Sequence, residues 1–505
     1  MELSSADISK LIAEIQADLK SESYSEKGPA LKLDTVYGGN PVFEGSPSAK
    51  SEMAPSVNYS AGLDLGKNGI FKSAEDAIEA AKRAQKELVD KFTLEDREKF
   101  VSAMRQSCRE HAKYLSELAH EETGYGHVKD KIAKHMLVAD RTPGTEDLKT
   151  IAKTGDRGLM LTEMAPFGVI GSITPSTNPT ATVINNAIGM IAAGNAVVYN
   201  PHPAAKKCSL TAVKLMNQAI VAAGGPDNLL CAPENPNMET GKIIMTSPVI
   251  RLLVVTGGEA VVKAAMNSGK KAICAGPGNP PVVVDETADI KRAAKGIVDG
   301  ISYENCILCI AEKEILVVDS VADLLIREMV AEGAYCLDAQ ELQKVCDTVL
   351  INKNGKYSPN KKFVGRDASY ILKAAGIMTN KDARAVICDV PFEHPLVHTE
   401  MLMPVVPVTR VKDVDDAIEK AVIAENNCHH TAMMYSTNVD NLTKMGRAID
   451  TTIFVKNAPS YAGLGFDGEG YTTLSIATPT GEGLTSAKNF TRSRRCVLQD
   501  SFRIV

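Results

Sequence analysis

The sequence contains no tryptophan, and aromatic residues make up only 5% of its 505 positions. Its hydrophobic content is nevertheless 44% and its charged content 23%, the balance of a chain that folds around apolar cores. Glycine (37) and proline (24) are too few for a collagen-like or low-complexity protein. The composition therefore predicts a globular protein, and its length predicts about three domains, or two with an appendage.

Long apolar runs are also missing. The most apolar stretch, residues 181–199, is interrupted by Asn185, Asn186 and Asn195, which predicts a buried segment of a soluble fold and no membrane span. The chain begins MELSSADISK, without the basic start and apolar core of a secretory signal. The net charge is −6, whereas a protein that binds nucleic acid through its overall charge is basic. The 11 scattered cysteines predict reduced thiols in the cytoplasm and no disulfide framework.

The first 60 residues are predicted to have two parts. Residues 1–20 carry apolar side chains at spacings of three and four, which predicts an amphipathic helix. This stripe consists of Ile8, Leu11, Ile12, Ile15 and Leu19. Residues 21–60 lose the periodicity and are rich in Ser, Gly, Pro and Asn, as a flexible linker is. The sequence thus predicts a short helix tethered to a large body.

The body is predicted to alternate helices with strands, after two helices over residues 73–91 and 94–120. Strands are expected over residues 168–173, 196–199 and 252–255, and the helices between them over residues 181–193 and 205–223. Such alternation predicts a parallel, doubly wound sheet. A second run starts at residues 282–285, with helices near 287–300 and 320–335 and strands near 313–318 and 403–408. Residues 149–164 predict a hairpin arm, because TGDRG separates two extended runs.

Cys306 and Cys309 form the densest pair of cysteines, in a Cys-X-X-Cys arrangement. A zinc site would need two more ligands at suitable spacing, and the sequence has no second Cys-X-X-Cys. Cys428, His429 and His430 are poor ligands if they lie in a strand, since consecutive strand residues face opposite sides. The spacing therefore predicts no metal site. A redox dithiol, two buried thiols and a nucleophile remain as alternatives for the pair.

Three segments rich in Gly, Pro or Asn each adjoin a predicted strand. They are Thr174–Pro179, Thr256–Gly258 and Gly276–Pro281. Backbone amides at the helix start after Thr256–Gly258 suit a phosphate group, and Asn178 has the amide that an oxyanion requires. Each segment alone is a weak signal, and Thr256–Gly258 alone is better explained as a structural turn.

In this order, the segments resemble those of the aldehyde dehydrogenase superfamily, from about residue 69 to the end of the chain. The resemblance implies an α/β fold with a doubly wound, Rossmann-type cofactor domain, an α/β catalytic domain and a small β arm for oligomerisation. It also implies that Cys309 is the nucleophile, that Asn178 stabilises the oxyanion, and that Glu400 binds the nicotinamide ribose. The other cofactor-binding residues that it implies are Thr174, Pro175, Asn200, Pro201, Thr256, Gly257 and Gly258.

The departures from the superfamily pattern are as informative as the matches. Hydrolytic members carry a glutamate that activates water at the position of Ala275, so water is expected to be a poor acceptor here. The CoA-acylating branch shows this loss, and the sequence resembles that branch at Cys309–Lys313, Thr478–Gly483 and Arg492–Leu498. Asn200 stands where most of the superfamily has a lysine that contacts the cofactor, which leaves the choice between NAD and NADP open.

The resemblance implies an enzyme that oxidises a short aldehyde with NAD and coenzyme A and releases an acyl-CoA through a cysteine thioester. Propionaldehyde is the first expectation for the substrate and acetaldehyde the second. Two alternatives are a hydrolytic aldehyde dehydrogenase, which Ala275 opposes, and an inactive scaffold, which the presence of Cys309, Asn178 and Glu400 opposes.

The resemblance also implies the domain boundaries. The cofactor domain is expected over residues 61–148 and 165–272, the catalytic domain over 273–455, and the oligomerisation arm over 149–164 and 486–505. An exposed strand edge of this kind seeks a partner, so a homodimer or homotetramer is expected.

The segment 1–20 resembles the encapsulation tails of bacterial microcompartment enzymes. An apolar stripe on a tether suits a groove of a partner, here a shell protein or another tail. The expected location is then the lumen of a microcompartment in the cytoplasm. Docking of the helix on its own body is the main alternative; a membrane-surface helix is the weaker one, because the segment has too few lysines.

Overall fold

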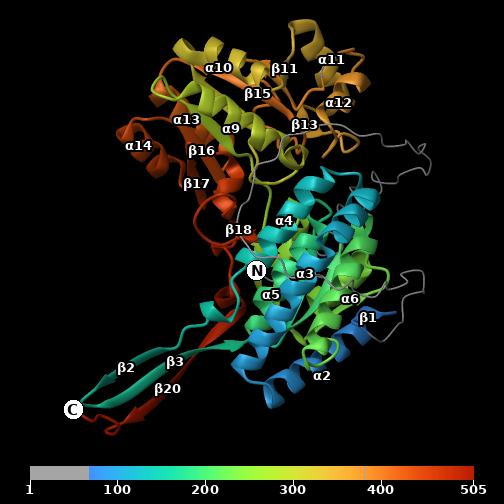
Figure 1. Cartoon of the computed structure of the whole chain (residues 1–505), viewed down its shortest axis with the longest axis vertical. Coiled ribbons are helices and arrows are strands. Elements are labelled where there is room, and N and C mark those ends of the chain that lie inside the picture. Colours follow the sequence, from blue (N-terminus) through green and yellow to red (C-terminus); the bar gives the residue numbers. More distant parts are fainter. Residues whose placement is uncertain (1–67, 380–381) are drawn as a thin grey trace, which may run out of the picture.

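The computed structural model of the chain describes residues 68–505 apart from residues 380 and 381. The predicted helix over residues 1–20 and the linker over 21–60 therefore lie outside the described residues. Figure 1 shows two lobes, each built on a sheet with helices packed around it, and a long arm that extends from the lower lobe. The arm ends at the C-terminus.

The first sheet has six parallel strands in the order β1-β6-β5-β4-β7-β8. Their bounds are β1 Ile70–Phe71, β4 Val169–Thr174, β5 Ala196–Pro201, β6 Leu230–Pro233, β7 Ile250–Thr256 and β8 Lys271–Ala275. The chain adds β5 and β6 on one side of β4 and then β7 and β8 on the other. A doubly wound sheet binds its ligand where the winding reverses, at the carboxyl ends of the strands. Here that point lies between β4 and β7.

Among the described residues, seven helices accompany this sheet, and local sequence signals fix their ends. They are α2 Ala74–Lys91, α3 Leu94–Thr123, α4 Val128–Arg141, α5 Pro179–Ala192, α6 Lys206–Ala222, α7 Met238–Thr246 and α8 Glu259–Met266. Thr93 and Asp96 form a capping box at the start of α3, and Gly124, with φ of 69°, ends the helix in the left-handed conformation. Every residue of α5 is buried, as the apolar stretch around Asn185 and Asn186 predicts.

The second sheet has seven parallel strands in the order β11-β14-β15-β10-β9-β16-β17. Their bounds are β9 Pro281–Val284, β10 Glu314–Val318, β11 Ala334–Cys336, β14 Ala385–Asp389, β15 Val405–Val411, β16 Thr431–Tyr435 and β17 Ile453–Lys456. Ile315 and Val317 of β10 face one apolar cluster, while Leu316 and Val318 face another. The sheet is therefore covered on both faces, as parallel sheets are.

Six helices accompany the second sheet. They are α9 Ile290–Ser302, α10 Asp319–Ala331, α11 Ala339–Val349, α12 Ala368–Ala374, α13 Val414–Glu425 and α14 Val439–Ile449. There are also two short hairpins, β12 Leu350–Lys353 with β13 Lys356–Pro359, and β18 Ile476–Ala477 with β19 Gly483–Leu484. The second of them packs beside β8 of the first sheet. The alternation of helices and strands in both runs confirms the predicted α/β class.

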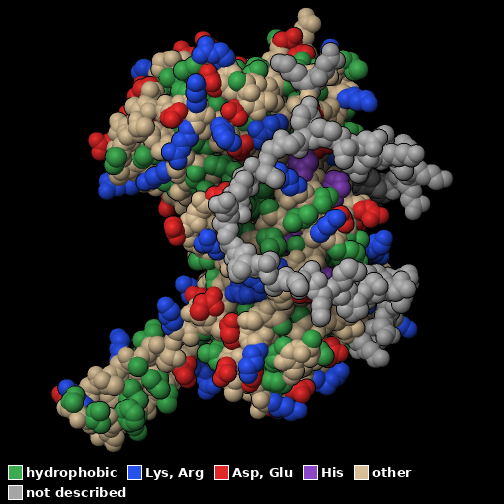
Figure 2. Space-filling view, viewed as in Figure 1, with side chains coloured by type: hydrophobic (Ala, Val, Ile, Leu, Met, Phe, Trp, Pro, Cys, Tyr) green, Lys and Arg blue, Asp and Glu red, His purple; other side chains and the backbone are tan. Residues whose placement is uncertain are grey.

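The arm is a three-stranded antiparallel sheet of β2 Ile151–Gly155, β3 Gly158–Pro166 and β20 Thr491–Gln499. β20 pairs with β3 along its whole length, from Thr491 opposite Pro166 to Gln499 opposite Gly158. The predicted hairpin and its C-terminal partner strand are thus confirmed. Apolar side chains gather at the end of the arm in Figure 2.

Three local predictions differ from the structure. The helix expected to reach residue 335 ends at Ala331, because a turn leads into β11. The segment Cys428–His430 is a loop and not a strand, since Asn426, Asn427 and His429 have φ values of 58°, 55° and 51°. β8 crosses the boundary predicted between residues 272 and 273.

Helix α4 was absent from the expected elements, and its composition gives the reason. Its buried residues include Lys131, Lys134 and His135 as well as Val138 and Ala139. A buried face that carries ionisable side chains does not show the apolar periodicity from which a helix is predicted.

Candidate active site

The candidate site lies where the carboxyl ends of the first sheet meet the amino ends of the second. Thr174 ends β4 and Thr256 ends β7, at the point where the winding of the first sheet reverses. From the second lobe, Gly278 precedes β9, Cys309 precedes β10 and Glu400 precedes β15. The fold therefore brings five segments, distant in sequence, to one region between the lobes.

Gly278 is the contact point of three of these segments. A Cβ atom on Gly278 would lie 2.8 Å from the carbonyl oxygen of Cys309 and 2.9 Å from Cγ of His430. The backbone N–H of Gly278 donates a hydrogen bond to Oε1 of Glu400 at 3.2 Å. Any side chain at this position would push these groups apart, so glycine is needed for the close packing.

The Cys309 thiol is held in an environment that favours its protonated form. Burial raises the pKa of Cys309 to about 12, and the negative charge of Glu400 acts in the same direction. The Lys313 ammonium and the backbone N–H groups of Cys309 and Ile310 lower the pKa and only partly offset the burial. Attack by this sulfur therefore requires that its proton be removed as substrate and cofactor assemble.

Lys313 fixes the loop that carries Cys309. Its Nζ atom donates to the carbonyl oxygens of Cys306 and Leu308, both at 2.9 Å, and lies 3.4 Å from Sγ of Cys306. Cys306 is completely buried, and its thiol donates to the carbonyl oxygen of Glu312 at 3.2 Å. Of the two cysteines, only Cys309 retains exposed surface, which favours it as the nucleophile.

Asn178 occupies the N-cap position of α5, but its side chain makes no capping hydrogen bond. Its Oδ1 atom instead accepts a hydrogen bond from the ammonium group of Lys134. Its Nδ2 atom makes no hydrogen bond within the described part of the chain. The amide N–H groups are therefore available to a bound oxygen atom.

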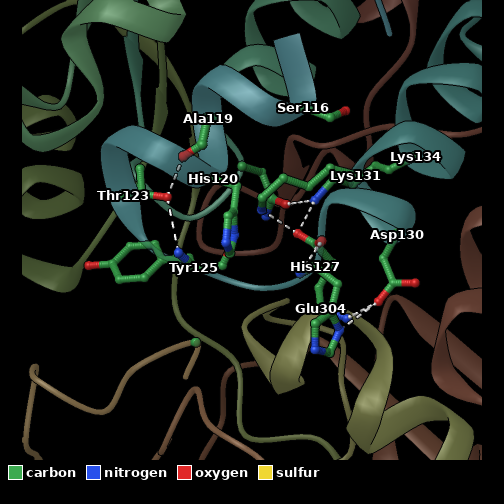
Figure 3. A network of polar contacts seen from close by, with 12 residues as sticks. Ser116, Ala119, His120, Thr123, Tyr125, His127, Asp130, Lys131, Lys134 and Glu304 are labelled. Atoms are coloured by element: carbon green, nitrogen blue, oxygen red, sulfur yellow. Dashed lines mark hydrogen bonds and ion pairs between the residues drawn. The ribbon is translucent and has the colours of Figure 1, made fainter. Parts of the chain in front are cut away.

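Lys134 belongs to a buried ionic cluster, which Figure 3 shows together with its surroundings. Oε2 of Glu304 lies 2.7 Å from Nζ of Lys131 and 2.9 Å from Nζ of Lys134. Glu304 is completely buried, and Lys131 and Lys134 are 2% and 4% exposed. Burial alone would raise the pKa of Glu304, but the two lysines hold it below its ordinary value. Burial lowers the pKa of Lys134, and Glu304 opposes that shift.

The loop that begins at Glu304 has an unusual backbone. Glu304, Asn305 and Cys306 all have left-handed φ values, of 53°, 54° and 60°. Such a conformation costs about 1–2 kcal/mol for residues such as Glu304 and Cys306, so side-chain contacts must hold the loop. Besides the contacts of Glu304, Nδ2 of Asn305 donates to Oδ1 of Asp367 at 2.8 Å.

The edge of the first sheet has the features of a dinucleotide site. Oγ1 of Thr174 is buried at the end of β4 without a hydrogen-bond partner in the described residues. Gly258 is the N-cap of α8, no side chain caps this helix, and the space beside Gly258 is open. Free amides at a helix start bind phosphate oxygens. Gly257 is held by its N–H group, which donates to the carbonyl oxygen of Ala275 at 3.2 Å.

The remaining cofactor-binding candidates lie along the same edge. Pro175 follows β4, and Pro201 at the end of β5 pairs with Thr174. The Asn200 side chain is engaged by α7, because its Oδ1 accepts from Oγ1 of Thr240 at 2.6 Å and its Nδ2 donates to the carbonyl oxygen of Asn237 at 3.2 Å. Asn200 thus braces the end of β5 against the start of α7.

Ala275 ends β8 and is 4% exposed. The segment around it is covered by the 478–483 loop, because Cγ of Pro479 lies 2.8 Å from a Cβ atom placed on Gly276. The backbone N–H of Cys274 donates to Oγ1 of Thr480 at 3.0 Å. The motif over residues 478–483 therefore shapes the turn on which the water-activating glutamate would stand.

His430 and an aromatic group were not expected at the site. His430 is completely buried, its Nε2 has no partner in the described residues, and burial lowers its pKa to about 4. The rings of Tyr303, Tyr461 and Phe466 have centroids 5.3–5.7 Å apart. Tyr303 and Tyr461 pack on the apolar cluster that Cys309 adjoins. His430 follows Cys309 by more than 100 residues, so the spacing between them gave no signal of this contact.

Comparison with known proteins agrees with this geometry. The profile of the aldehyde dehydrogenase family matches residues 67–469. The chain belongs to the aldehyde dehydrogenase family. It is 53% identical over 440 residues to acetaldehyde dehydrogenase (acetylating) of Salmonella typhimurium, covering 86% of this chain and 94% of that protein. It is 46% identical over 440 residues to propanal dehydrogenase (CoA-propanoylating) of the same organism, covering 86% and 93% of the two chains.

Solved structures of family members share the fold. Propionaldehyde dehydrogenase of Rhodopseudomonas palustris, solved with bound CoA and an acylated cysteine, superposes with a TM-score of 0.84 at 48% identity over 86% of this chain and 98% of that chain. Propionaldehyde dehydrogenase from the fucose utilisation microcompartment of Clostridium phytofermentans has the same TM-score at 50% identity, over 86% of this chain and all of that chain.

The sequence predicts neither a metal site nor a membrane span, and the structure bears on both predictions for the described residues only. Among them, no three His, Cys, Asp or Glu side chains are grouped so that they could hold a metal ion. None of the described helices combines the length and the apolar character that a membrane span requires.

Proposed function

We propose that this protein is a CoA-acylating aldehyde dehydrogenase that converts a short aldehyde, NAD⁺ and CoA to an acyl-CoA and NADH. One observation carries the proposal: the accessible Cys309 lies next to the edge that suits a dinucleotide, while Ala275 stands where hydrolytic members have their base. The acylating relatives at 53% and 46% identity support the same reaction.

Oxidation begins when the Cys309 sulfur, after loss of its proton, attacks the aldehyde carbon and forms a carbon–sulfur bond. The electron pair of the carbonyl bond moves onto oxygen, where the amide of Asn178 and the Cys309 backbone N–H stabilise it. The proton of Cys309 must pass to water or to a base that the bound substrate and cofactor bring to it, because burial lowers the pKa of His430 to about 4 and makes that imidazole too weak a base. As the carbonyl re-forms, hydride leaves the carbon and a thioester remains on Cys309.

The residues at the sheet edge fit a nicotinamide dinucleotide. Its phosphates suit the free backbone N–H groups at the start of α8, where the turn Thr256, Gly257 and Gly258 ends, and Glu400 suits the hydroxyl groups of the nicotinamide ribose. NAD supplies the acceptor for the hydride. Thr174, Pro175, Asn200 and Pro201 line the same edge, and Asn200 carries no charge that would reject the phosphate of NADP. Initial rates with NAD and NADP therefore test the choice between them.

The thioester needs an acceptor, and its nature separates the two possible enzymes. Glu400 is the carboxylate that acts on the pKa of Cys309, but it accepts a hydrogen bond from Gly278 and is assigned to the ribose. Residues Cys274–Pro281 include no Asp or Glu, so a water molecule at the thioester lacks a base from this segment. The sulfur of CoA, after its thiol has lost a proton to solvent, then attacks the acyl carbon, and Cys309 leaves as the thiolate.

Omission of CoA tests the proposal directly. Without CoA, NADH should form in a burst of about one equivalent per site and then nearly stop, because the thioester accumulates. Addition of CoA should restore steady turnover and release acyl-CoA. Steady NADH formation without CoA would instead identify a hydrolytic enzyme. The Ala275→Glu variant restores the glutamate of the hydrolytic members and should therefore raise turnover without CoA relative to wild type.

The substrate is proposed to be propionaldehyde or acetaldehyde. Relatives of both specificities match this chain over similar lengths. One methylene group changes binding by only about 1–3 kcal/mol, so a measured series is required. Values of kcat/KM for aldehydes of two to five carbons should peak at two or three.

The proposed location is the lumen of a bacterial microcompartment, reached through residues 1–20, which would bind a shell protein or other tails. The family member from the fucose utilisation microcompartment supports this assignment. The proposed assembly is a homodimer or homotetramer formed through the arm.

A further inference from the structure

The buried cluster of Lys131, Lys134 and Glu304 contains two ammonium groups and one carboxylate (Figure 3). Taken by themselves, these three groups carry one uncompensated positive charge; the carboxylate of Asp130, whose side chain is 21% exposed, also acts on Lys134. Burial of an uncompensated charge is unfavourable, because the interior solvates it poorly. A fold that only needed stability would be better served by apolar side chains at these three positions.

The extra positive charge is directed at one catalytic group. Lys134 donates to Oδ1 of Asn178, whereas no hydrogen bond joins Lys131 to Asn178. An ammonium group has only donors, so it can face the oxygen of an amide but not the nitrogen. This contact therefore fixes which way the Asn178 amide points, and it leaves Nδ2 directed away from Lys134.

The position of Asn178 reinforces this argument. An asparagine at an N-cap normally turns its oxygen toward the first amides of its own helix. In α5 that bond is not formed, because Lys134 holds the oxygen. The contact of Nε2 of His135 with Oγ1 of Thr180, at 2.9 Å, fixes α4 against the first turn of α5 and keeps Lys134 in place.

We propose that Lys134 is a positioning residue that acts through Asn178. It holds the amide so that its N–H groups face the oxygen that becomes negative when Cys309 attacks, and its charge polarises that amide. The inference rests on the proposed function, because it assigns Lys134 to the same reaction.

Glu304 connects the contact between Lys134 and Asn178 to the loop that carries the nucleophile. It anchors Lys134 and also begins the left-handed loop that leads to Cys309. Gly126 permits the arrangement, since a Cβ atom there would lie 2.9 Å from Cδ of Glu304. One carboxylate therefore sets the position of both the oxyanion donor and the loop of the attacking sulfur.

The test compares Lys134→Met with Lys131→Met. Each variant removes one ammonium group from the same helix and leaves Glu304 with one lysine, but only Lys134→Met removes the contact with Asn178. Loss of an oxyanion donor lowers the rate about 10²–10³-fold. The single-turnover rate of NADH formation should therefore fall about 100-fold in Lys134→Met and less than about fivefold in Lys131→Met.

A double-mutant cycle distinguishes a positioning role from a merely structural one, because it measures whether the effects of Lys134 and Asn178 on the rate are coupled. In an Asn178→Ala background, Lys134→Met should lower the rate less than about threefold further. Equal losses in the two methionine variants, or additive losses in the cycle, would overturn the inference. If thermal unfolding shows that the Lys134→Met protein is not folded, Lys134→Gln takes its place. Its single-turnover rate of NADH formation should fall at least about tenfold.

The wild-type assay separates this inference from the proposed function. If wild-type protein forms no NADH with any aldehyde, the proposed function fails. If wild type is active and Lys134→Met retains its rate, only the role of Lys134 fails.

Discussion

At the scale of single residues, Cys306 and Cys309 show how burial divides two identical side chains three positions apart. Cys306 is completely buried and its thiol donates to a backbone carbonyl, while Cys309 keeps exposed surface next to Gly278 and Glu400. Lys313 holds the loop between them. The chemistry is therefore expected at Cys309, and the structural contribution at Cys306.

Substitution of each cysteine tests this division. Cys309→Ala should abolish the NADH burst and acyl-CoA formation without loss of folding. Cys306→Ala should keep at least about a third of the activity and lose about 1 kcal/mol of stability, because it deletes one buried hydrogen bond. Burst amplitude and thermal unfolding of both variants check these outcomes. An active Cys309→Ala protein would rule out Cys309 as the nucleophile.

At the scale of elements, α4 joins the two lobes near the site. His127, the N-cap of α4, contacts Asp130 in its own helix through Nδ1 at 3.2 Å. Through Nε2 it contacts Asp367, the N-cap residue of α12, at 3.1 Å. These hydrogen bonds to Asp130 and Asp367 raise the pKa of His127 to about 10.

This raised pKa predicts a pH dependence of stability. The charged imidazole stabilises the folded state, so its contribution is fully present below the unfolded pKa of 6.5 and is lost as pH rises toward 10. The side chain is 44% exposed, which limits the effect to about 1 kcal/mol or less. Wild type should therefore exceed His127→Gln in unfolding free energy at pH 6 by more than at pH 10.

Denaturant unfolding at the two pH values measures that difference, and Asp367→Asn should remove part of it. A difference between wild type and His127→Gln that stays constant from pH 6 to pH 10 would contradict the assignment of a charged His127.

At the scale of the whole molecule, the arm is the feature whose apolar surface the single chain leaves uncovered. β20 is exposed along almost its whole length, and the arm presents Ile151, Val497 and Leu498 at 50%, 63% and 45% exposure. A narrow sheet with so much apolar surface needs further packing for stability. We expect a second copy of the chain to cover it.

A charge on the arm should weaken that assembly. Val497→Asp should shift the protein to smaller species or to aggregates in light scattering coupled to size exclusion. Val439→Asp is the matched control, because Val439 is a more exposed valine, at 72%, on the surface of α14. If both variants keep the wild-type size, the arm is not the interface.

The tail over residues 1–20 is tested at the same scale. Its deletion should leave kcat and KM unchanged, because the site is built from residues 174–430, and should abolish co-purification with shells. Ile12→Glu should act like the deletion, because it places a charge within the apolar stripe. Encapsulation of the deletion variant at the wild-type level would show that the tail serves another purpose.

Much of the fold could be predicted because its signals are local. The alternation of helices and strands, the hairpin of the arm and its partner strand all follow from periodicity and turn residues. Helix α4 escaped prediction because its buried face carries Lys131, Lys134 and His135. The roles of Cys309, Asn178 and Glu400 stay predictions, although the fold brings their segments together.

The sequence by itself determined the alternation of helices and strands and, through its resemblance to the aldehyde dehydrogenases, predicted Cys309 as the nucleophile and the missing base at Ala275, because residue type and position along the chain carry that information. Only the tertiary structure decided that Lys134 faces Asn178, 44 positions away, and that Glu304, 170 positions away, holds Lys134. Such contacts depend on how α4 packs against α5 and the loop before β10. A buried charged side chain such as Lys134 or Glu304 interrupts the local apolar pattern, so its burial cannot be predicted from that pattern.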